Sequence, residues 1–142
     1  MAGSLFVEIV TPESALWAGN ATALIGRSSD GEFTVLAQHT PLVGDIVPSV
    51  VRVTTADGER SFVVHGGFFQ VGSEGSFENT RATVLAGIVE DVATLDVPRA
   101  QAAKDAADAA LAALRGDEGD GGEVAALRAA LARAELRLAA AH

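Results

Sequence analysis

Five charged residues in the last part of the chain could form an anion-binding cluster: Glu90, Asp96, Arg99, Arg133 and Arg137. Arg133 and Arg137 are four positions apart, so a helix places both on one face. If two helices pair antiparallel there, both arginines come near Arg99. Guanidinium groups that lie close together repel unless carboxylates or an anion lie between them, and arginine holds phosphate through paired hydrogen bonds. Two interpretations remain open, a phosphate-bearing ligand or a surface network of ion pairs with a modest stabilising effect.

No other set of residues has a spacing that points to catalysis or metal binding. The chain has no cysteine, which excludes disulfides, thiolate metal sites and a thiol nucleophile. His39, His65 and His142 are far apart, and Lys104, the one lysine, follows no Gly-rich run, so neither a histidine metal site nor a P-loop is expected. A Ser-His-Asp triad stays open, although no nucleophile elbow is present. The acidic run 117–123 lacks the ligand spacing of a calcium loop and is expected to be a solvated linker. We therefore predict no catalytic residue and no metal site.

Composition narrows the class of protein further. The chain has 142 residues, enough for one domain with an appendage, and 49% of them are hydrophobic, which is typical of a folded protein. Its 19 acidic and 10 basic residues give a net charge of −9, which disfavours binding to nucleic acid or to an anionic lipid surface. No apolar run approaches the roughly 20 residues that span a bilayer, and the first residues do not have the pattern of a signal peptide. We expect a protein of the cytosol or of the cytosolic side of a larger assembly.

The composition changes near Leu95, from a part rich in Val, Gly, Thr and Phe to one dominated by Ala, Leu and Arg. In the first part, turn signals recur every 8–12 residues or so. The strongest is Asp57-Gly58, because this dipeptide accepts a positive φ at low cost. Strands are expected at 5–10, 21–25, 32–36, 50–54, 61–64, 68–71 and 81–85, with turns that include 72–76. No helical period separates the strands, so a parallel α/β sheet is not expected, and we predict a small all-β sandwich or barrel over residues 1–94.

The remaining part predicts two helices in an antiparallel hairpin over residues 95–142. Asp96 is expected to cap the first helix, with Pro98 in the first turn, where a missing N–H costs little. The Gly- and Asp-rich joint 115–123 is expected to continue neither helix. Apolar residues recur at spacings of three and four in two narrow seams, Ala100, Ala103, Ala107, Ala110 and Leu114 in the first helix and Val124, Leu127, Leu131, Ala134 and Leu138 in the second.

The hairpin is expected to be weakly held, because one of its seams is mostly alanine. Burying a leucine side chain stabilises by ~1.5–3 kcal/mol, and burying an alanine methyl by about 0.8 kcal/mol. An Ala-rich helix also has a high intrinsic propensity, so it persists when its partner leaves. Two interpretations follow: a hairpin that switches between two arrangements, or one that stays packed.

Six short motifs follow one another along nearly the whole chain. They are Val10-Thr11-Pro12-Glu13; Asp30-Gly31-Glu32-Phe33; His39-Thr40-Pro41-Leu42-Val43; Gly66-Gly67-Phe68-Phe69-Gln70-Val71; Asn79 with Thr83-Val84-Leu85-Ala86; and Leu95-Asp96-Val97-Pro98-Arg99-Ala100. Each is weak alone. Together, in this order and at these separations, they resemble one family, the epsilon subunits of the F-type proton-translocating ATP synthase.

The resemblance implies a non-catalytic subunit that needs no cofactor. Members of this family combine an antiparallel β-sandwich with a helical hairpin, which implies here an all-β antiparallel sandwich of about ten short strands over residues 1–94. They lie on the rotating central stalk, between the gamma subunit and the c ring. They help to couple proton translocation to ATP synthesis. In bacterial members the hairpin can leave the sandwich, reach the alpha/beta hexamer and inhibit ATP hydrolysis. The implied location is peripheral, on the cytoplasmic face of the bacterial cell membrane, without insertion into it.

The resemblance also assigns two sets of site residues. Its Leu-Asp-x-x-Arg-Ala motif belongs to members that bind ATP, as a regulatory ligand, at the folded hairpin. The matching positions are Glu90, Leu95, Asp96, Arg99, Ala100, Arg133 and Arg137. The positions that match the face meeting the c ring are Gly31, Glu32, His39, Thr40, Pro41 and Leu42.

The loop around His39 to Leu42, which the resemblance assigns to the c ring, is here called the docking loop. Three departures from the family pattern precede its histidine. Thr34, Ala37 and Gln38 stand where the family usually has Gly, Pro and Gly, which leaves open a different loop conformation. The competing hypothesis is a free-standing ATP-sensing β-sandwich module that regulates another protein. A stand-alone enzyme is a third hypothesis, for which no catalytic set of residues speaks.

Overall fold

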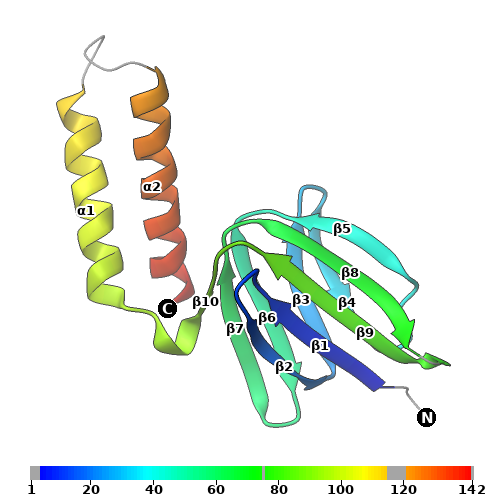
Figure 1. Ribbon diagram of the computed structural model, residues 1–142. Coiled ribbons are helices and arrows are strands. Elements are labelled where there is room, and N and C mark those ends of the chain that lie inside the picture. Colours follow the sequence, from blue (N-terminus) through cyan, green and yellow to red (C-terminus); the bar gives the residue numbers. More distant parts are fainter. Residues whose placement is uncertain (1–3, 75, 115–120, 142) are drawn as a thin grey trace. The chain divides into compact units, whose positions relative to one another are not determined.

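The computed structural model describes residues 4–74, 76–114 and 121–141 (Figure 1). The chain divides into two compact units between Ala93 and Thr94. Strands make up the first unit and a pair of helices makes up the second.

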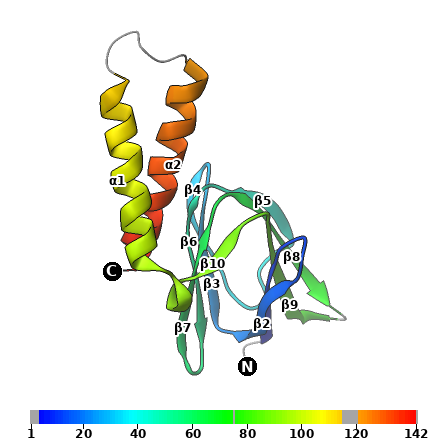
Figure 2. The same ribbon diagram turned by 60° about the vertical axis from the view of Figure 1, so that its left-hand side comes forward.

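Ten strands lie in the described part of the first unit: β1 Ser4–Val10, β2 Ala15–Ala21, β3 Ala23–Ser28, β4 Gly31–Val35, β5 Leu42–Ile46, β6 Ser49–Thr55, β7 Gly58–Val64, β8 Gly67–Glu74, β9 Ser76–Ala86 and β10 Val89–Asp91. They form two five-stranded sheets, with strand orders β2-β1-β9-β8-β5 and β10-β7-β6-β3-β4. The sheets stack face to face (Figures 1 and 2). Neighbouring strands pair antiparallel except for β1 and β9, which run parallel. The predicted β-sandwich and helical hairpin are confirmed, with one parallel pair in a mostly antiparallel fold.

Alternation along the strands produces the core, because successive side chains of a strand point to opposite faces. In β1, Leu5, Val7 and Ile9 are buried, and the residues between them are partly exposed. The same pattern in the other strands fills the space between the sheets with valines and a few larger side chains, of which Phe62 is the largest that is fully buried.

Two phenylalanines connect the sheets, and each needs a glycine beside it. The rings of Phe33 in β4 and Phe69 in β8 stack with centroids 4.0 Å apart. Each ring lies over the glycine paired with it on the neighbouring strand, Gly26 for Phe33 and Gly44 for Phe69. A Cβ atom on Gly26 would lie 2.6 Å from the Phe33 ring, and one on Gly44 would lie 2.5 Å from the Phe69 ring. The glycines therefore make room for the aromatic contact.

Two Asp-Gly sequences of the sandwich, Asp30-Gly31 and Asp57-Gly58, each end a hairpin turn, as predicted for Asp57-Gly58. Gly31 and Gly58 have φ values of 123° and 127°, which glycine adopts without strain. In both turns a hydroxyl three residues earlier, Ser28 or Thr55, donates to the glycine carbonyl and accepts from the aspartate N–H. The same side-chain chemistry therefore fixes both turns.

Three strands fall almost entirely outside the predicted ranges. β2 and β5 contain Gly19-Asn20 and Gly44-Asp45, residue types with low strand propensity, and β10 has three residues. The expected strand at 21–25 is also displaced, because β3 begins at Ala23. The turn expected at 72–76 is shorter, since β8 continues to Glu74 and β9 begins at Ser76. Pairing with neighbouring strands, which residue types do not reveal, extends these elements.

A 3-10 turn, η1 Val92–Thr94, precedes the two helices, α1 Val97–Ala113 and α2 Gly121–Ala140. As predicted, Asp96 caps α1, with its Oδ1 accepting from the N–H of Arg99 at 3.0 Å. α2 begins at Gly121 and not after the predicted joint 115–123, of which 115–120 lie outside the described residues. The N–H groups of a first turn need no acceptor within the helix, and Glu123 there is favoured by the positive end of the helix dipole.

The two helices contact each other along the predicted seams with one correction. Ala100, Ala107 and Ala134 are buried between them. Ala103 is exposed, although it was predicted to lie in the seam, and Lys104 is half-buried. The long stem of a lysine covers apolar surface that an alanine methyl does not reach, so the contact line passes through position 104.

Candidate functional site

Of the seven residues predicted for the ATP site, six lie in the helical unit and Glu90 lies in the sandwich unit. Asp96 is exposed and its carboxylate holds the first turn of α1, while Leu95 before it is half-buried. Arg99 and Arg133 are exposed, Ala100 is buried, and Arg137 is half-buried. Asp96 therefore has a structural task whether or not a ligand is bound.

One lysine of α1 interacts with acidic side chains of both helices. Lys104 Nζ donates to Asp108 at 2.9 Å. That carboxylate is the main reason why the pKa of Lys104 is raised, and Glu135 on α2 contributes to the same shift.

The two helices run antiparallel (Figure 1), so the last turn of α2, with Arg137, lies toward the start of α1, with Arg99. Arg133 precedes Arg137 by about 6 Å, roughly one turn, along α2. The structure thus brings Arg99 and Arg137 toward one end of the hairpin and sets Arg133 further along it.

Glu90 belongs to the sandwich unit, where it lies in β10. Its Oε1 is 2.7 Å from Nε2 of His65, at the end of β7. Glu90 therefore lies in a different unit from the other six residues predicted for the ATP site.

The predicted c-ring residues fall into two groups at opposite ends of β4. Gly31 and Glu32 begin the strand, and Glu32 lies 3.8 Å from Arg52. The exposed turn before them is tied to β5, because Ser29 donates through both its N–H and its Oγ to Asp45 at 3.0 Å.

The second group, His39 to Leu42, follows the other end of β4, about 14 Å away along the strand. Thr40, Pro41 and Leu42 are exposed. His39 Nδ1 lies 2.7 Å from the carbonyl oxygen of Thr40, which orients the ring. Two separated surfaces, and not one continuous patch, therefore correspond to the predicted docking face.

The conformation of the docking loop depends on one of the three departures. Gln38 has a φ of 68°, the left-handed conformation in which glycine is preferred. Its N–H donates to the buried Thr80 Oγ1 at 2.6 Å, and the N–H of His39 donates to the carbonyl of Leu36 at 3.2 Å. The loop therefore adopts a glycine-like turn although a glutamine occupies the position.

An apolar patch on the outer face of one sheet was not found from the motifs. Phe68 pairs with Leu85 and Leu85 with Val10 across three strands. Phe68 is 61% exposed and Leu85 is 44% exposed. They border an open groove of about 530 Å³, here called the apolar groove, lined by Val10, Thr11, Pro12, Gly66, Gly67, Phe68, Leu85, Ala86 and Gly87. The sequence contained a signal for this patch. Phe68 and Phe69 are adjacent in a predicted strand, and successive side chains of a strand point to opposite faces, so one of the two must face outward.

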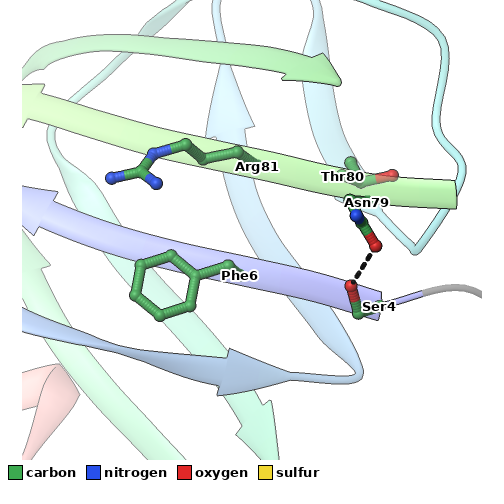
Figure 3. A pocket seen from close by; sticks show the side chains of 5 residues that line it. All are labelled: Ser4, Phe6, Asn79, Thr80 and Arg81. Carbon is green, nitrogen blue, oxygen red and sulfur yellow. Dashed lines mark hydrogen bonds between the residues drawn. The ribbon is translucent and has the colours of Figure 1, made fainter. Parts of the chain in front are cut away.

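A second hollow, of about 380 Å³, lies beside the start of β1 (Figure 3). Ser4 and Asn79 face each other across β1 and β9 and share a hydrogen bond of 3.2 Å. The Arg81 guanidinium lies 5.2 Å from the centre of the Phe6 ring, and its Nε donates to Glu8 at 2.9 Å. The Arg81 guanidinium thus has its partners within the sheet, and we assign no binding function to this hollow.

Within the described ranges, no three His, Asp or Glu side chains gather in a way that could hold a metal ion. No described helix is both long and apolar enough to cross a membrane.

These features define a class: a small β-sandwich protein with a helical hairpin, whose candidate sites are exposed surfaces. The model of the β-sandwich domain of the ATP synthase delta/epsilon chain matches residues 4–92, more than half of the chain. The chain belongs to this family, and the resemblance drawn from the six motifs is confirmed.

Related sequences and structures agree with this family. The chain is 42% identical over 102 residues to the ATP synthase epsilon chain of Thermobifida fusca, an alignment that covers 70% of this chain and 71% of the relative. It is 39% identical over 98 residues to that of Rhodococcus jostii, covering 68% and 75%. Its fold resembles a chain in the cryo-EM structure of the Euglena gracilis mitochondrial ATP synthase, described as OSCP/F1/c-ring, with a TM-score of 0.79, 19% identity and coverage of 100% and 84%. A chain of the Tetrahymena thermophila central stalk/c-ring structure is similar at a TM-score of 0.59, with 11% identity and coverage of 99% and 98%.

Proposed function

We propose that the chain is a non-catalytic docking subunit of a rotary ATP synthase, which links the gamma subunit of the central stalk to the c ring and so couples proton translocation to ATP synthesis. The observation that carries this proposal is the exposed apolar groove on the sandwich, because large apolar side chains exposed together mark a surface that binds another protein. The family supports the choice of assembly. Two structures with a similar fold contain an F1/c-ring assembly and a central stalk with a c ring.

Each partner has a surface that suits it. The apolar groove, with Phe68 and Leu85 at its border, receives the gamma subunit, since a permanent contact buries apolar area. The two polar groups at the ends of β4, with Glu32 and His39, meet the c ring. The subunit is therefore peripheral, on the cytoplasmic face of the membrane.

The test removes the apolar groove's contacts without altering the core. In Phe68→Ser/Leu85→Ser, both substituted side chains are exposed, so the sandwich is expected to fold. We expect this variant to lose co-purification with the gamma subunit from detergent-extracted membranes, whereas Val97→Ser, an exposed apolar residue of α1, retains it. Recovery of the unmodified chain only in the soluble fraction, without stalk partners, would instead favour a free-standing regulatory module.

The helical unit supplies a second role, binding ATP as a regulatory ligand. Arg99 and Arg137 lie at the same end of the hairpin, where an anion between them offsets their repulsion. The alanine contacts at Ala100, Ala107 and Ala134 hold the helices weakly, so a ligand that bridges them favours the closed hairpin. The released hairpin reaches the alpha/beta hexamer and inhibits ATP hydrolysis.

ATP titration of the full chain tests this site. Arg99→Ala and Arg137→Ala are each expected to weaken binding about tenfold or more, since each removes a charge-assisted contact to phosphate. Arg128→Ala is the matched control, because this exposed arginine of α2 precedes Arg137 by about 13 Å along the helix, toward the other end of the hairpin. Unchanged affinity in both variants would refute the ATP site and leave the arginines as an ion-pair network.

A further inference from the structure

His65 is a buried histidine that none of the functions above uses. It follows β7, and its side chain is 5% exposed. Its Nε2 lies 2.7 Å from Oε1 of Glu90 in β10, and its backbone N–H donates to the carbonyl of Ile88 at 3.2 Å. The second ring nitrogen, Nδ1, is buried and finds no hydrogen-bond partner among the described residues.

The environment of the two ring nitrogens selects one tautomer. A carboxylate only accepts hydrogen bonds, so Nε2 must carry a proton to bond to Glu90. A proton on Nδ1 would be a buried donor without an acceptor, which costs more than a lone pair left without a donor. The ring therefore carries its proton on Nε2 and leaves Nδ1 bare.

The contact between His65 and Glu90 ties β10 to the end of β7. β10 has three residues and lies at the edge of its sheet, paired only with β7. Its residues are all half-buried. Besides the backbone ladder, His65 bonds to Glu90, the middle residue of β10, and Arg60 bonds to Asp91 at 2.6 Å.

We propose that His65 is a positioning residue, which as the Nε2–H tautomer holds the Glu90 carboxylate, and with it strand β10, against the sandwich. The contact is here called the His65–Glu90 clasp. It fixes the last strand before the 3-10 turn that leads to the helical unit.

The first experiment determines the tautomer in the unmodified full chain. In a ¹⁵N-labelled sample near pH 7.5, the clasp predicts a proton on Nε2 of His65 and none on Nδ1. His39 is the internal reference for a histidine whose Nδ1 faces a carbonyl oxygen and which should carry its proton there. A proton on His65 Nδ1 would overturn the proposal.

The second experiment measures local opening by amide hydrogen exchange. His65→Ala is expected to speed the exchange of residues 88–91 about tenfold, while β1 is unchanged. In His65→Gln the side-chain amide can still donate to Glu90, so exchange should stay within about threefold of the unmodified chain. Glu90→Ala should match His65→Ala, and the double variant should add little, because both remove one contact.

Several outcomes would overturn the clasp. They are no change in His65→Ala, faster exchange throughout the sandwich, or a His65→Gln variant as open as His65→Ala. If His65→Ala does not fold, the tautomer and the His65→Gln variant still decide. Asp91→Asn is the matched control, since it weakens the other tie of β10 and leaves the His65 tautomer unchanged.

Discussion

Gln38 shows how a single residue can keep a conformation that its type disfavours. A left-handed φ costs an L-residue about 1–2 kcal/mol. At Gln38, with φ of 68°, the hydrogen bond from its N–H to Thr80 Oγ1 offsets part of this cost. The loop before His39 therefore depends on a buried threonine of the opposite sheet.

Gln38→Gly is expected to raise the free energy of unfolding by about 0.5–1 kcal/mol, because relief of the backbone strain exceeds the added entropy of the unfolded chain. The measurement is urea-induced unfolding. A decrease would show that the glutamine side chain contributes more than its backbone costs.

Thr80→Val should lower the free energy of unfolding by about 1–3 kcal/mol, since it leaves the Gln38 N–H without an acceptor. Thr83→Val, a change of the same kind at a half-buried position of β9, is the control and should be nearly neutral. Equal effects of the two variants would count against the role of Thr80 in the loop.

Among the elements, the two sheets are joined by aromatic rings that need glycines beside them. Gly44→Ala is expected to destabilise the sandwich by about 1–3 kcal/mol, because its Cβ would lie 2.5 Å from a Phe69 ring that is itself stacked on Phe33. Gly72→Ala in β8 is the matched control, since open space surrounds its Cβ position, and it should change stability by less than about 0.5 kcal/mol. Thermal unfolding of both variants decides the point.

The start of α1 has a structural role that must be separated from ligand binding. Asp96→Ala removes the cap and should destabilise the first turn by about 1 kcal/mol, seen as faster amide exchange at residues 97–101. Asp96→Asn keeps a capping oxygen and should leave exchange nearly unchanged. If Asp96→Asn nevertheless weakens ATP binding, the carboxylate charge itself takes part in the site.

For the molecule as a whole, the division between Ala93 and Thr94 permits a test of the helical unit in the assembled complex. A chain that ends at Thr94 is expected to raise the ATP hydrolysis rate of the assembled ATP synthase several-fold, because it removes the helices to which we assign the inhibition under the proposed function. A chain that lacks only residues 121–142 separates the contribution of α2 from that of α1. An unchanged rate in both would show that the hairpin does not inhibit under those conditions.

Local residue chemistry made much of this fold predictable. The two Asp-Gly turns, the Asp96 cap, the seven predicted strands that the structure contains in some form and the two helices follow from preferences that act within a few residues. The six motifs identified the family because their order along the chain is a property of sequence alone. What they could not show is β2, β5 and β10, whose residues form strands only because neighbouring strands offer hydrogen-bond partners.

The sequence by itself determined the type of most elements and the family, and it predicted the residues of an anion site. Only the tertiary structure decided that the predicted docking residues form two groups at opposite ends of β4, and that Phe68 and Leu85 meet on one outer face. It also decided that His65 is buried against Glu90, twenty-five residues away. The reason is that turns and caps depend on near neighbours, whereas a shared face or a buried pair depends on strand register, which distant parts of the chain set together.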